Sequence, residues 1–175
     1  MNALRRVVPL LALAALAAAG CMLTSGQFVA TYDLPDPITV SQSLVETFEV
    51  DLNTVSAYND HKSQIKRVED MALVGDFTNS GSSAAQIEVW LVATPSPPLP
   101  PQQNGVRLWG PLTIAGNATE KVDWDRSASL FAGRQALIDE VKGDGHFRLY
   151  VICSGGVAPV TVTKSSLIVV VGAAI

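Results

Sequence analysis

Residues 72–94 read ALVGDFTNSGSSAAQIEVWLVAT and carry the pattern that decides the fold class. Two apolar runs, 72–79 and 86–94, flank a turn-forming sequence rich in Asn, Ser and Gly. In the second run, apolar side chains recur at every second position, at Ile87, Val89 and Leu91. This period of two is typical of a strand with one buried face. The pattern predicts two β-strands joined as a hairpin.

The same alternation recurs along the chain. It is clearest in ETFEVDL at 46–52, where Phe48, Val50 and Leu52 share one face. A second hairpin is predicted from strands at 106–115 and 119–124, which flank a Gly-Asn turn. Further strands are predicted at 146–153, 160–162 and 167–171.

Two stretches have helical rather than alternating spacing. Residues 58–68 match a helix weakly, whereas 129–142 match it better and end with Lys142 and Gly143, as a helix C-terminus often does. Helices and strands do not alternate along the chain, and there is no internal repeat. The sequence therefore predicts an all-β fold, an antiparallel β-sandwich of immunoglobulin-like or Greek-key type, with one or two short helices.

The first 21 residues read MNALRRVVPLLALAALAAAGC. Two arginines precede a short apolar stretch, and Ala18-Ala19-Gly20 place small residues before Cys21. This leader resembles a bacterial lipoprotein signal peptide. The resemblance covers the leader alone, and it implies removal of residues 1–20 and acylation of Cys21 by chains such as palmitate. In this family an aspartate directly after the cysteine often retains the protein in the inner membrane. Here Met22 occupies that position, which implies the outer membrane, with the periplasmic and the surface face as alternatives.

Two other interpretations of the leader remain. Ala17-Ala18-Ala19 also fits an ordinary secretory cleavage site. A membrane span is the third, although the apolar run is short and lacks a basic stop. With the lipoprotein interpretation, the predicted organisation is a signal peptide at 1–20, a lipidated cysteine and tether at 21–35, and a sandwich domain at 36–175.

Charge and cysteine content restrict the function. Without Arg5 and Arg6 the chain has 10 basic and 16 acidic side chains, a formal charge of −6. Nucleic-acid binding needs clustered Lys and Arg, so no nucleic-acid partner is expected. If Cys21 is acylated, Cys153 has no intramolecular disulfide partner, and its strand phase predicts a buried thiol.

Aromatic side chains are the candidates for binding. Trp90 and Tyr150 are out of phase with the apolar residues of their strands, so they are predicted to face outward or toward a covering layer. Trp124 is included as a third candidate. The proline-rich segment 95–101 (PSPPLPP) is predicted to be an extended surface loop, and it is a further possible contact.

No catalytic residue, metal site or cofactor is predicted. His61 and His146 lie near aspartates but are 85 positions apart without a diagnostic ligand spacing. Calcium-loop, phosphate-loop and nucleophile-elbow patterns are all missing. The favoured hypothesis is a non-catalytic envelope lipoprotein that binds a protein partner or supports an assembly. The alternatives are a lipoprotein that binds a glycan or small molecule and, less favoured, an envelope hydrolase.

Overall fold

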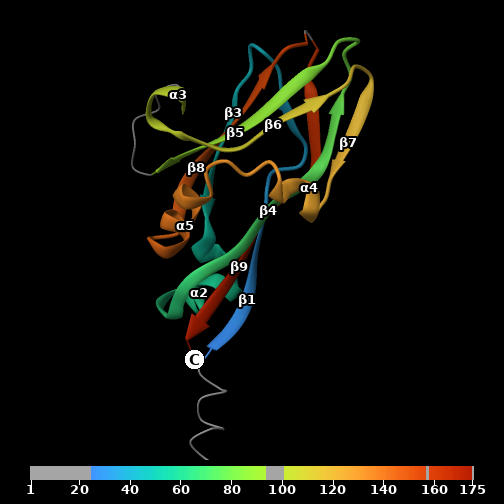
Figure 1. Cartoon of the computed structure of the whole chain (residues 1–175). Helices are drawn as coiled ribbons and strands as arrows, with labels where there is room; N and C mark the ends of the chain where they lie inside the picture. Colours follow the sequence, from blue (N-terminus) through green and yellow to red (C-terminus); the bar gives the residue numbers. More distant parts are fainter. Residues whose placement is uncertain (1–24, 94–100, 157, 175) are drawn as a thin grey trace, which may run out of the picture.

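The computed structural model describes residues 25–93, 101–156 and 158–174. These residues form two antiparallel sheets packed together (Figure 1). One sheet has the strand order β1-β9-β4-β7, with β2 also paired to β9, and the other has the order β3-β8-β5-β6. The predicted all-β sandwich is confirmed, although the described residues contain four short α-helices where one or two were expected.

The strands are β1 (Ser25–Asp33), β2 (Ile38–Val40), β3 (Glu46–Asp51), β4 (Ile65–Asn79), β5 (Ala85–Ala93), β6 (Val106–Ile114), β7 (Ala118–Val122), β8 (His146–Ser154) and β9 (Val160–Ala174). The α-helices are α2 (Ser56–Asn59), α3 (Pro101–Asn104), α4 (Trp124–Ala128) and α5 (Arg134–Lys142). Two 3-10 turns, η1 (Leu52–Thr54) and η2 (Lys62–Gln64), lie on either side of α2.

The 15-residue strands β4 and β9 run side by side along the molecule (Figure 1). At about 3.3 Å per residue they span roughly 50 Å. Strand β9 joins the two apolar runs predicted at 160–162 and 167–171. Its buried positions change phase between Val162 and Ser165, where Lys164 has a φ of 53°. The predicted strand 167–171 is part of β9 and is central in its sheet, with Leu167, Val169 and Val171 facing the core.

Both predicted hairpins are wrong. Strands β4 and β5 belong to different sheets, and so do β6 and β7. Each of the two turns, 80–84 and 115–117, instead carries the chain over the edge of the sandwich, from one layer to the other. Every one of these strands has one buried face, which is why each shows alternation. Two consecutive strands show the same alternation whether they pair in one sheet or face each other across the core. Among the described strands, β5 and β6 are the only sequence neighbours that pair.

A buried asparagine connects the two turns that cross between the sheets. Asn79, 1% exposed, donates from Nδ2 to the carbonyl oxygens of Ser83, Ile114 and Ala115 at 2.9, 3.2 and 3.2 Å. Its Oδ1 accepts the N–H of Gly81 at 2.9 Å. Asn79 thus satisfies backbone groups of both turns that neither sheet can satisfy.

The two predicted helices are only partly present. In the first, α2 and η2 occupy 56–64, but Ile65 begins β4 because pairing with β9 overrides the thin helical pattern. In the second, the helix α5 begins at Arg134, not at residue 129. Strand 119–124 also ends early, at Val122. Asp123, which lies within the predicted strand 119–124, caps α4 by accepting the N–H of Arg126 at 2.9 Å.

The segment between α4 and α5 closes one side of the sandwich. Strand β7 pairs only with Gly75–Asn79, so the edge of β4 below Gly75 needs another cover. Ser127 of α4 supplies it by accepting the N–H of Leu73 at 2.7 Å. On the other sheet, the edge of β6 is covered because Ala132 donates to the Leu108 carbonyl oxygen at 3.0 Å. These contacts cover the edge of β4 at Leu73 and that of β6 at Leu108, where the backbone is thus not open to pairing with another chain.

The structure changes the predicted domain boundary. Residues 25–33, assigned to a tether, form the strand β1 and pair along their whole length with β9. The sandwich thus begins at Ser25 rather than at residue 36. The leader, Cys21 and most of the proline-rich segment lie outside the described residues, and Pro101 begins α3. Within the described residues, no helix combines the length and apolar character required to cross a membrane.

Candidate binding surface

The outer face of the sheet β3-β8-β5-β6 gathers aromatic and charged side chains. Alternation along these strands sends one set of residues into the core and the other outward. We call the outward set the aromatic–ionic face, and define it as Glu49, Glu88, Trp90, Arg107, Arg148 and Tyr150. Four strands contribute to it, so its composition depends on the strand order as well as on the sequence.

Trp90 and Tyr150 lie directly opposite each other on this face. They are register partners in the antiparallel ladder of β5 and β8. Side chains at opposed positions of such a ladder have Cβ atoms about 5 Å apart and are in contact range. The structure thus brings together two of the three aromatic residues predicted for binding.

Ionic contacts hold Trp90 in place. Its indole nitrogen Nε1 donates to Glu88 Oε2 at 3.1 Å, and Arg107 donates to the other oxygen of the same carboxylate at 3.1 Å. Arg107 is also the register partner of Trp90 on β6. The indole is half-buried and the guanidinium is exposed, so the group presents an oriented ring beside a cation. Such a pair suits both stacking and hydrogen bonding to a partner.

A second ionic group lies along β3 and β8. Arg148 donates to Glu49 Oε1 at 2.8 Å, and His146 Nε2 is 3.6 Å from Glu49 Oε2. The hydrogen bond from Arg148 lowers the pKa of Glu49, and the bonds to Glu49 and Tyr150 raise the pKa of Arg148. The charges of this pair persist across the physiological pH range, because both shifts favour the ionised forms.

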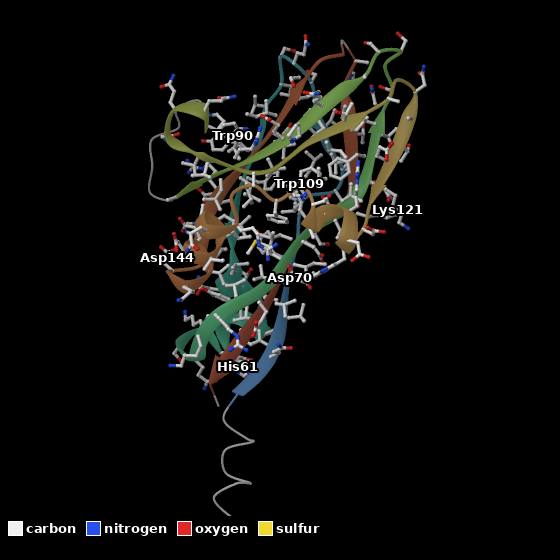
Figure 2. All side chains as sticks on the ribbon, viewed as in Figure 1. His61, Asp70, Trp90, Trp109, Lys121 and Asp144 are labelled. Atoms are coloured by element: carbon white, nitrogen blue, oxygen red, sulfur yellow. The ribbon has the colours of Figure 1, made fainter. Side chains whose placement is uncertain are left out.

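Tyr150 differs from Trp90 in its burial. It is 7% exposed although it points to the outer side of the sheet. Val92, two residues after Trp90, is 1% exposed on the same side. The chain leaving α3 covers this end of the face, since a Cβ added at Gly105 would lie 2.9 Å from Val92 Cγ2. Both interpretations of the outward aromatics thus apply, because Tyr150 is covered and Trp90, labelled in Figure 2, remains partly exposed.

Trp124 is not part of this face. It is the first residue of α4, and its Nε1 donates to Asp70 Oδ2 on β4 at 3.2 Å. Arg134 of α5 donates to the other oxygen, Oδ1, at 3.0 Å. Burial acts to raise the pKa of Asp70, but hydrogen bonds from Arg134, from the Met71 N–H and from Trp124 outweigh it and lower the pKa. Trp124 and Arg134 therefore fasten α4 and α5 to β4.

The residues weighed for metal or nucleophilic chemistry are dispersed. His61 is exposed beside η2, with its ring centroid 5.2 Å from that of Phe28, whereas His146 begins β8. Among the described side chains, no group of three or more His, Cys, Asp or Glu is placed to hold a metal ion. Cys153 is 4% exposed, and burial raises the pKa of its thiol, which suppresses the reactive thiolate.

The charged members of the face were missed at the sequence level. A signal for two of them exists, because Glu88 and Arg148 each stand two residues before an aromatic candidate and so share its side of the strand. Glu49 and Arg107 had no such signal. Their place beside the aromatics follows from the pairing of β3 with β8 and of β6 with β5.

Comparison with known proteins does not assign a family. No family model matches the chain, and no curated protein matches it. One solved structure that is similar is described as "Structure of infectious bursal disease virus Gt strain", at 10% identity and a TM-score of 0.30. The match covers 85% of this chain and 32% of the viral one, so it spans about a third of that protein. It gives this chain no function.

Proposed function

We propose that this protein is a non-catalytic bacterial lipoprotein, anchored in the outer membrane through Cys21, that binds a protein partner of the cell envelope through the aromatic–ionic face. The observation that carries the binding proposal is the pairing of Trp90 with Tyr150, bordered by two ionic groups. Tyr, Trp and Arg are the side chains that dominate binding energy at protein interfaces.

The order of this face supports a binding role. Glu88 and Arg107 fix the indole of Trp90, and Glu49 fixes Arg148, so little side-chain entropy remains to be lost on association. A partner with an apolar centre and complementary charges at its rim fits this arrangement. The anchor rests on the leader residues and on Cys21, four positions before the first strand.

The binding proposal is tested by recovering the full-length protein from its own membranes in mild detergent and identifying co-purified envelope proteins. Trp90→Ala removes the most open aromatic and is expected to reduce partner recovery at least tenfold, as loss of a central interface aromatic does. Tyr150→Phe is the second variant, because truncation of a buried tyrosine to alanine would disturb the fold. Thermal melts establish that each variant is folded.

Trp124→Ala is the matched control, since it removes another half-buried indole, which belongs to α4 and lies against β4 of the other sheet. Partner recovery should be unaffected by this change. Loss of the partner with Trp124→Ala, together with unchanged partner recovery with Trp90→Ala, would contradict the proposed face. The anchor is tested separately with Cys21→Ser, which should abolish incorporation of radiolabelled palmitate and release the protein from membranes.

A second function, binding of a glycan, is favoured by one observation. The half-buried ring of Trp90 lies beside a carboxylate and a guanidinium, the combination that stacks on a sugar and hydrogen-bonds its hydroxyl groups. A ligand that binds only the folded state raises the melting temperature. A rise with an envelope polysaccharide that is lost in Trp90→Ala would favour this function, and an unchanged melting temperature would count against it.

A further inference from the structure

We propose that the end of the sandwich formed by η2 and the start of β4 contacts the membrane itself, with Lys62, Lys66 and Arg67 facing anionic lipid headgroups. We call this end the basal surface and define it as Gln27, His61 and Lys62–Arg67. The inference rests on the proposed lipid anchor at Cys21 and extends it from attachment to the orientation of the domain.

The topology places the first strand at the basal surface. Ser25 at the start of β1 is the register partner of Ala174, and Ile65 at the start of β4 is the partner of Ala173 (Figure 1). A hollow of about 270 Å³ between these elements is lined by Gly26, Gln27, Phe28, His61, Gln64 and Ala173. The residues of η2 therefore lie beside the point at which the chain enters the sandwich (Figure 2).

The length of the chain limits how far this end can be from the membrane. Because β1 begins at Ser25, four peptide units separate it from Cys21. An extended chain covers at most about 3.6 Å per residue, so the Cα atoms of Cys21 and Ser25 are at most about 14 Å apart. This upper limit is less than twice the screening distance of about 8 Å at physiological ionic strength. A tether to residue 35 would have permitted a far greater separation.

The charge of the basal surface differs from that of the whole chain. Residues 61–67 of the basal surface carry three basic side chains and no acidic one, with Asp60, Glu69 and Asp70 flanking them, while the chain after the leader has a formal charge of −6. Of the flanking acids, Glu69 is ion-paired with Arg67. Lys62 donates to the neutral Asn53 and acts through its charge on the nearby carboxylate of Asp51. Lys66 is exposed. Lysine side chains near an anionic bilayer surface are attracted to it.

Lys66 and Lys121 form a matched pair for the test. Both are exposed lysines on one sheet, but Lys121 is the register partner of Asp76, which lies ten residues further along β4 than Lys66. At about 3.3 Å per residue the two positions are roughly 33 Å apart along the strand, which is several times the screening distance. Reversal of either charge changes the net charge equally, and only Lys66 belongs to the basal surface.

The experiment uses the full-length lipidated protein with a fluorophore on Ser63→Cys, an exposed position of η2. Cys153 is buried and does not compete for the label. Quenching by acrylamide, a neutral solute, is compared in vesicles of phosphatidylcholine with and without phosphatidylglycerol. The label should be protected in the anionic vesicles, and high salt should remove the protection. Each basic side chain near such a surface changes the equilibrium constant for membrane contact roughly fivefold. Lys66→Glu should therefore reduce this constant, measured from the protection of the label, at least about fivefold, and Lys121→Glu should leave it unchanged.

Equal quenching in the two kinds of vesicle, with the protein floating with the lipid, would overturn the basal contact and leave the anchor intact. An equal effect of Lys66→Glu and Lys121→Glu would also overturn it, because net charge rather than position would then govern the contact. Failure of the unmodified protein to float with vesicles, without acyl label on Cys21, would overturn both the anchor and the basal contact.

Discussion

The indole nitrogen of Trp109 donates a hydrogen bond of 3.1 Å to the hydroxyl oxygen of Ser127, and this bond joins an edge of one sheet to the helix that covers an edge of the other. The same hydroxyl oxygen accepts the Leu73 N–H at 2.7 Å. Trp109 and Ser127 are both 0% exposed, and the Trp109 ring stacks on Phe77 with centroids 5.6 Å apart. One small polar side chain therefore ties both layers together inside the core.

Replacement of Ser127 by alanine is expected to lower the free energy of unfolding by about 2–6 kcal/mol. The reason is that two buried donors, the Trp109 indole and the Leu73 N–H, lose their acceptor, at about 1–3 kcal/mol for each. Urea titration monitored by fluorescence measures the change. Ser129→Ala, two residues away and exposed, should stay within about 0.5 kcal/mol of the parent. An equal loss in the two variants would contradict the role of the buried bond.

Asn79→Ala is expected to destabilise the fold by about 2–3 kcal/mol, since backbone groups of both crossing turns lose their partner in a site that is almost fully buried. Asn117→Gly is the control at the same end of the molecule. Asn117 is exposed with a φ of 55°, which glycine adopts readily, so the change should be close to neutral. Calorimetric melting temperatures give both values, and a neutral Asn79→Ala would show that the turns hold their crossing without the side chain.

Ser165→Val is expected to stabilise the protein by about 1 kcal/mol. The hydroxyl of Ser165 is buried without a hydrogen-bond partner, and it lies beside a cavity of about 10 Å³ whose other lining residues are apolar. Removal of an unpaired polar group and filling of the space with methyl groups both favour the folded state. Ser165→Ala removes the hydroxyl without filling the cavity and should give a smaller gain. A loss of stability in both variants would indicate that the hydroxyl binds an internal water.

The lowered pKa of Asp70 leads us to expect that the stability of the fold depends on pH. Its pKa is below the usual value of 3.8 in the folded state, so the unfolded chain binds the proton more tightly. The stabilisation from its bonds is therefore present above the unfolded pKa and is lost as the pH falls through the folded pKa. The difference in unfolding free energy between the parent and Asp70→Asn should be constant from pH 7 to about pH 5 and should shrink below pH 4. A difference that grows on acidification would contradict this linkage.

The candidate surface was predictable only in part. The phase of Trp90 within its strand is a local property, because Ile87, Val89 and Leu91 identify the buried side without reference to any partner. That Tyr150 lies opposite Trp90 depends on the pairing of β5 with β8, two strands far apart in the sequence. For Trp124 the alternation was misleading, since the Asp123 cap starts a helix at that residue.

The sequence by itself determined which side is buried in each strand that it predicted, although β1, β2 and the start of β4 were not among those strands. Alternation is sufficient for this, because successive side chains of an extended chain point to opposite sides whatever the strand pairs with. Only the tertiary structure decided which strands share a sheet. A turn such as 80–84 permits both a hairpin and a crossing between layers, and the choice depends on long-range packing against β9 and β8 and on Asn79, which satisfies the backbone where the chain leaves its ladder.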